Sequence, residues 1–247
     1  MRPSFNAAIC LLIKDENEYI DEWLGWHIGI GFQHFYIYDN GSRVPIRESV
    51  DVRYKPYCTF IDFSGEYENT QLECYADAID QYGDDVKWLA FIDTDEFIRP
   101  LNGEDINSFL ARFEDHDGLY VRWVVFNANG LWEKDSRPQR ERFTRVSSNI
   151  PNKPFGKSII RPARIKCMGT HFPTGMLGQY DMVDGNGRYI KTAFSEFSPD
   201  DKIVIDHYFT RSYEEWQEKT QRGSCDPRCD RKYDEFFLFN PEMEVHE

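Results

Sequence analysis

Apolar and polar residues are arranged in blocks along the first hundred positions of the chain. Apolar residues recur with a helical spacing from Ile20 to Ile28, and again on one face of a segment from Asn69 to Tyr82. Between these segments stand short, almost continuously apolar runs, which are typical of strands buried on both faces. We predict strands at 7–13, 34–38 and 58–61, and a fourth strand that ends at Asp93. Such alternation predicts an α/β fold with a mostly parallel sheet and helices on both faces.

The second half of the chain has a different pattern. It is rich in Gly, Pro, Asn and Arg, and its apolar runs are short and widely spaced. We predict helices at 106–113 and 213–221, with strands at 119–126, 157–160 and 202–205. Because no linker composition separates the halves, we expect one domain over 1–247. Its parts are an alternating half to about residue 100, a loop-rich mixed half over 101–223 and a tail over 224–247.

Polar clusters follow three of the predicted strands. They occupy 14–18, 39–42 and 93–96, directly after the apolar runs. The carboxyl ends of parallel strands lie at one edge of a sheet, where open α/β folds bind ligands. We therefore expect the three clusters to meet in one crevice.

The third cluster carries three carboxylates, Asp93, Asp95 and Glu96, within four positions. Crowded carboxylates repel one another unless a cation lies between them. Mg²⁺ and Mn²⁺ prefer oxygen ligands and keep positions open for substrate phosphates. The Asp-Thr-Asp stretch is thus a candidate metal–diphosphate site, although the alternative, an acidic loop that faces water, is common for so short a motif.

The overall charge limits the choice of partners. A formal net charge of −14 argues against nucleic acid, which needs a basic surface. The segment 137–166 is an exception, with nine basic residues and one acid, Glu141. It could bind a small anion locally, or its charges could be spread over solvated strands. Lys157, just before a strand in this segment, is the main candidate for a phosphate contact, followed by Arg211 and Arg222; the alternative for each is a surface salt bridge.

The cysteines and the apolar runs indicate an intracellular protein. Six cysteines in a chain of this size are expected to be reduced thiols, and Cys225 and Cys229 are expected to be loop thiols, since no second pair completes a zinc site. The longest apolar run is strand-sized, so no transmembrane segment is expected. No signal peptide is recognisable either. We expect a cytoplasmic location, with peripheral membrane association left open.

Several stretches together resemble the GT-A glycosyltransferases, specifically family 92 and the related family 2-type group. The matching stretches, in the same order as in that group, are 14–27 (KDENEYIDEWLGWH), 31–42 (GFQHFYIYDNGS), 88–97 (WLAFIDTDEF), 141–145 (ERFTR), 156–162 (GKSIIRP) and 206–212 (DHYFTRS). Asp15 departs from the pattern, because the group usually has Asn before the Glu. The last two dozen residues match nothing in it.

The resemblance implies a Mn²⁺ or Mg²⁺ ion held by Asp93, Asp95 and His207, with Asp93 also reaching the ribose. His207 could instead be a packed core histidine, as we expect for His27, and His171 is its rival. The first hundred residues would then be the nucleotide-binding half and 101–223 the acceptor-side half. The nucleotide-sugar is expected to contact Lys14, Glu16, Asp39, Asn40, Ser42, Gln71, Lys157 and Arg211.

If the reaction inverts the sugar carbon, as it does in family 92, a carboxylate must take the acceptor hydroxyl's proton. Glu141 is the candidate general base, Asp135 and Asp181 are its rivals, and Glu133 lies in the same loop-rich half. Trp132 could stack on an acceptor sugar. The function expected is transfer of a sugar from a UDP- or GDP-linked donor to a glycan or lipid-linked acceptor. The alternatives are a nucleotidyl- or phosphotransferase, which lacks support because there is no Gly-rich phosphate loop, and a non-catalytic carbohydrate-binding module.

Overall fold

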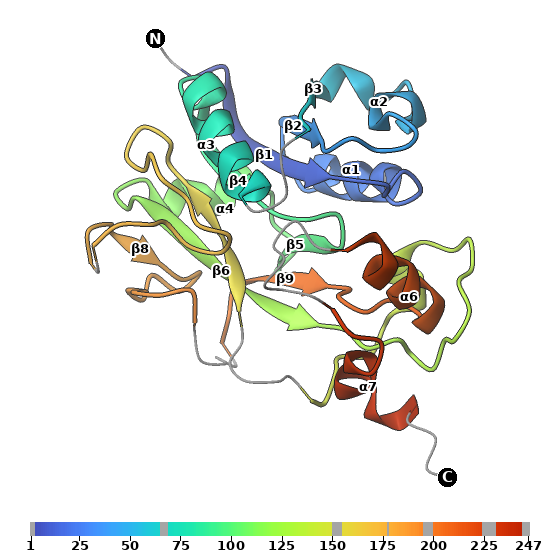
Figure 1. Cartoon of the computed structure of the whole chain (residues 1–247). Helices are drawn as coiled ribbons and strands as arrows, with labels where there is room; N and C mark the ends of the chain where they lie inside the picture. The colour runs from blue at the N-terminus through green and yellow to red at the C-terminus, as the bar shows by residue number, and fades with distance from the viewer. Residues whose placement is uncertain are drawn as a thin grey trace.

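The computed structural model describes residues 3–64, 69–149, 155–176, 178–194, 200–223 and 231–243. Its strands form one curled sheet in the order β3-β2-β1-β4-β7-β6-β9-β5, with β8 paired to β6 (Figure 1). The first four strands in this order are β3 (Cys58–Asp62), β2 (His34–Asp39), β1 (Phe5–Ile13) and β4 (Val86–Phe91). All three pairings among them are parallel. The predicted parallel sheet of the first half is therefore confirmed.

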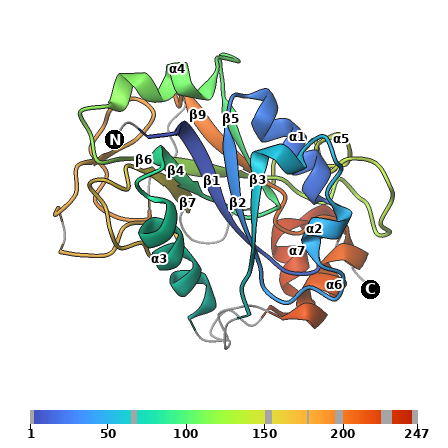
Figure 2. The same cartoon turned by 90° about the horizontal axis from the view of Figure 1, so that it is seen from above.

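Helices cover both faces of this parallel part. In Figure 2, α1 (Ile20–Gly29) and α2 (Ile46–Ser49) lie on one side of the strands and α3 (Thr70–Tyr82) lies on the other. Alternate residues of β1 explain why its apolar run is continuous. Ile9 and Leu11 pack in the cluster that includes α1, whereas Ala8 and Cys10 pack in the cluster that includes α3. Burial on both faces thus removes β1 almost completely from water.

The second half adds antiparallel strands to the same sheet. Strand β7 (Gly156–Ile160) pairs antiparallel with β4 and with β6 (Gly118–Val125), and β6 pairs in parallel with β9 (Ile203–His207). The short strand β8 spans Met182–Val183. Strand β5 (Glu96–Pro100) begins directly at the acidic cluster and pairs antiparallel with β9. The sequence pattern had not predicted β5, because five residues with an Arg and a Pro give too short a signal.

The remaining helical segments complete the fold. They are α4 (Ile106–Leu110), α5 (Gln139–Arg142), α6 (Tyr213–Arg222) and α7 (Glu235–Phe239), with 3₁₀ turns at Lys55–Tyr57, Ala111–Phe113 and Pro241–Met243. The described part of the tail, 231–243, for which no family resemblance was expected, packs against α6. Phe236 and Met243 join Trp216 and Ala128 in a small separate core. The Trp216 indole also donates a hydrogen bond to the Lys232 carbonyl at 3.1 Å.

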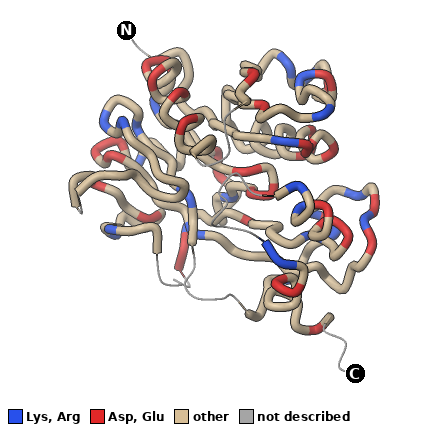
Figure 3. The backbone as a smooth tube through the Cα atoms, in the orientation of Figure 1, with Lys and Arg blue, Asp and Glu red and all other residues tan. Residues whose placement is uncertain are grey.

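Three further expectations concern cysteines, membranes and charge. Cys10, Cys58, Cys74 and Cys167 are free thiols, while Cys225 and Cys229 lie outside the described residues. Within the described ranges, no helix has the length and apolar character needed to cross a bilayer. Acidic and basic residues are interspersed along the backbone (Figure 3). The basic segment is accordingly divided among separate ion pairs, such as Lys157 with Asp93 and Arg164 with Asp117.

Candidate functional site

The candidate site is built around the turn that joins β4 to β5. The amide of Glu96 donates to the carbonyl of Asp93 at 3.1 Å, which closes a tight turn over Asp93, Thr94 and Asp95. The Trp23 indole of α1 donates to the carbonyls of both Asp93 and Glu96, at 3.0 and 2.9 Å. One buried aromatic ring therefore fixes both ends of the turn. The positions of Asp93 and Asp95 are thus set by hydrogen bonds of the turn's backbone.

The Asp93 carboxylate faces a buried lysine. Lys157 Nζ lies 2.9 Å from Asp93 Oδ2 and 3.9 Å from Glu96 Oε1. Burial alone would lower the pKa of Lys157, but these two carboxylates outweigh it and raise this pKa well above its usual value. Lys157 is therefore a fixed positive charge. The Asp93 side chain remains 38% exposed, and Gln71 Nε2 approaches its other oxygen at 3.5 Å.

Glu96, by contrast, is fully buried. Its Oε2 accepts a hydrogen bond from the Asp93 amide at 2.9 Å, whereas Oε1 has no hydrogen-bond partner among the described residues. Burial raises the pKa of Glu96 well above its usual range, and the nearby Lys157 only partly opposes this. Glu96 therefore stabilises the turn from inside the protein, and its buried side chain is not available to contact a donor.

The Asp95 carboxylate faces a second buried lysine, which the sequence pattern did not reveal. Lys219 Nζ of α6 lies 2.5 Å from Asp95 Oδ2 and donates to the Phe209 carbonyl at 2.8 Å. Burial would raise the pKa of Asp95, but Lys219 and then His207 hold it well below its usual range. Burial in turn lowers the pKa of Lys219 to about 8, an effect that Asp95 opposes. Asp95 is thus ionised.

His207 ends β9 beside Asp95. Its Nε2 lies 3.7 Å from Asp95 Oδ1, and its Nδ1 is buried with no hydrogen-bond partner in the described ranges. Burial lowers the pKa of His207, so the imidazole is neutral near pH 7. The Trp123 ring packs against it, with centroids 4.3 Å apart, and also contacts His171 at 5.2 Å. A neutral imidazole next to an ionised carboxylate is a pair that can bind a divalent metal.

The loop after β1 contributes an ion-pair network to the same edge of the sheet. Glu16 pairs with Arg211 at 2.7 Å and with Arg222 at 2.5 Å. Arg211 also stacks on the Tyr19 ring at 3.7 Å and donates to Gln139 Oε1 at 2.7 Å. Burial would raise the pKa of Glu16, but the two arginines lower it overall. Glu16 is thus shared by two arginines, so these three side chains together keep one positive charge in excess. Arg211 Nη2 is buried with no partner among the described residues.

The loop after β2 is tied to the loop after β1. Both oxygens of Asp39 accept backbone hydrogen bonds, from Ser42 at 2.9 Å and from Ile46 at 2.8 Å. Ser42 Oγ accepts from the Asp15 amide at 3.0 Å, and the Asn40 amide donates to the Ile13 carbonyl at 2.8 Å. Asp39 therefore shapes its own loop in this structure. Lys14, the first residue of the β1–α1 connection, is partly buried.

The three strand-end clusters do converge. Ile13 is in register with Asp39 between β1 and β2, and Cys10 is in register with Phe91 between β1 and β4. The carboxyl ends of these three strands consequently lie at one edge of the sheet. His207 and Lys219, from the other half of the chain, reach the same edge through Asp95.

The candidate general bases lie on other segments. Glu141 is exposed on α5, and Asp135 bonds to Arg137 two residues further on at 2.6 Å. The Asp181 side chain bonds to His116 at 2.9 Å, and the Asp181 amide donates to Asp117 Oδ2 at 2.9 Å. Asp117 precedes the start of β6, at the opposite end of that strand from Val125, the partner of His207. Glu133 is exposed. The choice among these carboxylates stays a prediction.

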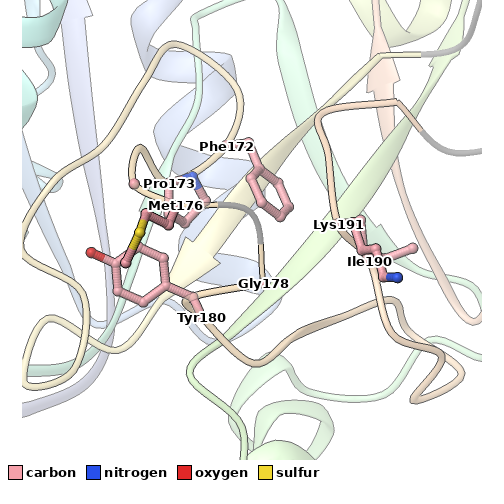
Figure 4. A pocket seen from close by; sticks show the side chains of 8 residues that line it. Phe172, Pro173, Met176, Gly178, Tyr180, Ile190 and Lys191 are labelled. Atoms are coloured by element: carbon pink, nitrogen blue, oxygen red, sulfur yellow. The ribbon is translucent and has the colours of Figure 1, made fainter.

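A shallow pocket of about 130 Å³ lies away from the strand-end clusters, in the segment around β8 (Figure 4). Its lining includes Phe172, Met176, Tyr180 and Lys191. None of the predicted site residues lines it. Met176 is 80% exposed there, so the walls of this pocket are largely open to water.

The side chains around Asp95 are of the kinds that bind a divalent metal, but they are few in number. Asp95 Oδ1 and His207 Nε2, 3.7 Å apart, are oxygen and nitrogen donors of the kind that Mn²⁺ accepts. Among the residues that the structure describes, no group of three or more His, Cys, Asp or Glu side chains is arranged to hold a metal ion. Such a metal would therefore need phosphates and water to complete its shell, as Mg²⁺ commonly does in phosphate-binding sites.

Lys219 is the functional candidate that sequence reasoning missed. A usable signal existed, since Trp216 and Lys219 are three residues apart and so lie on the same face of α6. Its partner could not have been inferred, because Asp95 is 124 residues away in sequence. The acidic cluster was expected to need a cation. Lys157 and Lys219 of the chain itself provide positive charge beside it.

A mostly parallel first half with charged loops gathered at the carboxyl edge of its strands places the chain in the class of open α/β proteins, which bind ligands at this edge. Comparison with known sequences then identifies the family. The profile of glycosyltransferase family 92 matches residues 7–235, and the chain belongs to this family. The predicted family is therefore confirmed, and with the observed architecture the predicted GT-A fold class is confirmed as well.

Individual relatives are distant. A family 92 protein of Ricinus communis is 21% identical over 91% of this chain and 41% of its own length. Another, from Oryza sativa subsp. japonica, is 20% identical over 65% of this chain and 28% of its length. A galactan β-1,4-galactosyltransferase of Arabidopsis thaliana is 24% identical over 69% of this chain and 36% of its length. The chain thus spans less than half the length of these curated relatives.

Solved structures give weaker similarity. TarS of S. aureus aligns with a TM-score of 0.47 and 12% identity over 87% of this chain and 62% of that chain. Its complex with UDP-GlcNAc aligns with a TM-score of 0.43 and 14% identity, over 65% and 46% of the two chains.

Proposed function

We propose that this chain is a glycosyltransferase that moves a sugar from a nucleotide-sugar to a hydroxyl group of a glycan or lipid-linked acceptor, with inversion. The observation that carries the proposal is the convergence of the loops after β1, β2 and β4 at one edge, where Asp95 and His207 meet. Membership of family 92 supports the reaction class. The donor is expected to be UDP- or GDP-linked.

Each group at this edge has a task in binding the donor. The loops after β1 and β2 would hold the nucleoside, because Ser42 and Asp15 join them into one unit. Lys157 would keep the Asp93 carboxylate oriented and add positive charge near the diphosphate. Arg211, with a buried Nη2 that lacks a partner among the described residues, could donate to a phosphate oxygen.

Asp95 and His207 would hold a Mn²⁺ or Mg²⁺ ion, with Asp93 as a further ligand. When bound, the metal would neutralise the charge that develops on the departing nucleoside diphosphate. Burial favours this role, since the lowered pKa of His207 keeps its imidazole free to bind metal. The low pKa of Asp95 likewise keeps its carboxylate ionised.

The test is donor hydrolysis and binding with a set of nucleotide-sugars. UDP-galactose belongs in this set, since one relative is named a galactosyltransferase. We expect release of UDP or GDP that requires Mn²⁺, and an increase in melting temperature with UDP plus Mn²⁺. Asp95→Asn should abolish release, whereas Glu114→Gln, which removes an exposed carboxylate paired with Lys87, should retain it.

The same experiment separates the alternatives. Stabilisation by ATP in preference to UDP and GDP would favour a nucleotidyl- or phosphotransferase. If no nucleotide raised the melting temperature, with or without metal, the proposed transferase would be refuted.

A further inference from the structure

Lys219 already provides the Asp95 carboxylate with a cation, on its Oδ2 atom. Its ammonium lies 2.5 Å from Asp95 Oδ2, and the ammonium also lies 4.7 Å from the centroid of the Phe209 ring. Helix α6 holds it there firmly. Ser212 and Glu215 form a capping box at the start of this helix, and Trp216 is fully buried beneath it.

A metal on the other side of the same carboxylate would be close to this ammonium. Asp95 Oδ1 faces His207 Nε2, so a metal bound by these two atoms would share one carboxylate with Lys219. Two cations within a few ångströms of each other in a buried site repel strongly. Arg211 adds to this repulsion, because its charge already acts on Asp95.

We propose that Lys219 is a built-in counter-cation that competes with the divalent metal for Asp95. Metal and nucleoside diphosphate then bind strongly only together. The diphosphate brings negative charge that stabilises the metal and receives the ammonium displaced from Asp95, which the flexible lysine side chain permits. This inference rests on the proposed function, since it takes the metal and the diphosphate from there.

The competition has a thermodynamic signature. If the nucleotide tightens metal binding by some factor, the metal must tighten nucleotide binding by the same factor. Part of this factor comes from direct contact between metal and phosphate, and part from removal of the ammonium. Replacing Lys219 with an uncharged side chain removes only the second part. The metal should then bind tightly even without nucleotide.

The first measurement is Mn²⁺ binding to the nucleotide-free protein. Binding is measured by calorimetry and by the electron spin resonance signal of free Mn²⁺. We expect Lys219→Met to bind Mn²⁺ at least tenfold more tightly than the unaltered protein. Lys134→Met is the matched control, because Lys134 pairs with Glu218, the neighbour of Lys219 on α6. It removes the same charge and should change Mn²⁺ affinity less than twofold.

The second measurement repeats the titration with saturating UDP. In the unaltered protein UDP should tighten Mn²⁺ binding, and in Lys219→Met this factor should be at least tenfold smaller. If Lys219→Met binds Mn²⁺ no more tightly than Lys134→Met without nucleotide, the inference is wrong. Lys219→Gln, which keeps a hydrogen-bond donor for the Phe209 carbonyl, replaces Lys219→Met if that variant does not fold.

Failure of the inference and failure of the proposed function give different results. If the unaltered protein binds UDP with Mn²⁺ but Lys219→Met gains no Mn²⁺ affinity, the transferase proposal stands and the competition is refuted. If UDP binds to neither protein, the transferase proposal is refuted, and the nucleotide-free titration still decides whether Lys219 competes for Asp95.

Discussion

Replacing Glu215 with Gln should destabilise the protein by about 3 kcal/mol at neutral pH. Glu215 is buried and accepts two hydrogen bonds from Arg142, at 2.6 and 2.9 Å. It also accepts from Tyr19 at 2.7 Å and from the Ser212 hydroxyl at 2.6 Å. The substitution keeps the shape of the side chain but removes the closest counter-charge of the buried Arg142 guanidinium, whose other carboxylate, Asp135, lies 3.8 Å away. Loss of one partner of a buried ion pair typically costs about 3–5 kcal/mol.

The pKa of Glu215 gives an independent value. Burial would raise this pKa, but the hydrogen bonds from Arg142 and the charge of Arg211 outweigh it and lower the pKa from 4.5 to about 2. A decrease of this size corresponds to roughly 3 kcal/mol, at about 1.4 kcal/mol for each pH unit. Because the folded-state pKa is the lower one, this contribution is complete above about pH 4.5 and is lost as the pH falls towards about 2.

Urea denaturation at several pH values tests both parts. The difference in unfolding free energy between the unaltered protein and Glu215→Gln should be about 3 kcal/mol at pH 7 and should shrink by roughly 1 kcal/mol at pH 3.5. Glu218→Gln is the control, because Glu218 lies on the same helix with a side chain that is 56% exposed. A difference below about 1 kcal/mol at pH 7, or one that does not change with pH, would contradict the reasoning.

Three further predictions concern the turn and its surroundings. Trp23→Phe removes the indole hydrogen bonds to Asp93 and Glu96, so donor hydrolysis should fall at least tenfold while circular dichroism shows an intact fold. Lys157→Met should lower UDP affinity in the presence of Mn²⁺, measured by calorimetry, because Asp93 loses its fixed partner; unchanged affinity would exclude that role. His207→Phe should weaken Mn²⁺ binding in the presence of UDP, because it removes the imidazole beside Asp95. His116→Phe, which removes only the pair of His116 with Asp181, should leave Mn²⁺ binding unchanged.

The fold was largely predictable, because its central strands carry continuous apolar runs. Successive residues of β1 face α1 and α3 in turn, so every position in its apolar run had to be apolar. The pattern therefore revealed both the strand and the presence of helices on both of its faces. Strand β5 and helix α7 were not predictable in this way. Each has five residues, and each is stabilised by partners far away in sequence, such as β9 and Trp216.

The site was predictable only in part, for a related reason. Asp93 and Asp95 could be selected because like charges after a buried strand require compensation. Lys157 could be selected because it stands just before a strand in the basic segment. The sequence could not show which cation compensates each carboxylate, since that depends on how β7 and α6 dock. It also could not distinguish the exposed Asp93 from the buried Glu96, three residues further on. Burial, which differs between these two carboxyl groups, is a property of the assembled sheet.

The packing of the tail under α6 makes the end of the chain part of the chemistry at Asp95. A shortened form that stops after Gly223 would lack the apolar cover of Trp216 provided by Phe236, together with the acceptor that Lys232 offers its indole. Helix α6 would then lose part of the packing that holds it in place, and Lys219 would no longer be positioned beside Asp95. Truncation at this point would thus weaken the ion pair of a carboxylate more than a hundred residues upstream.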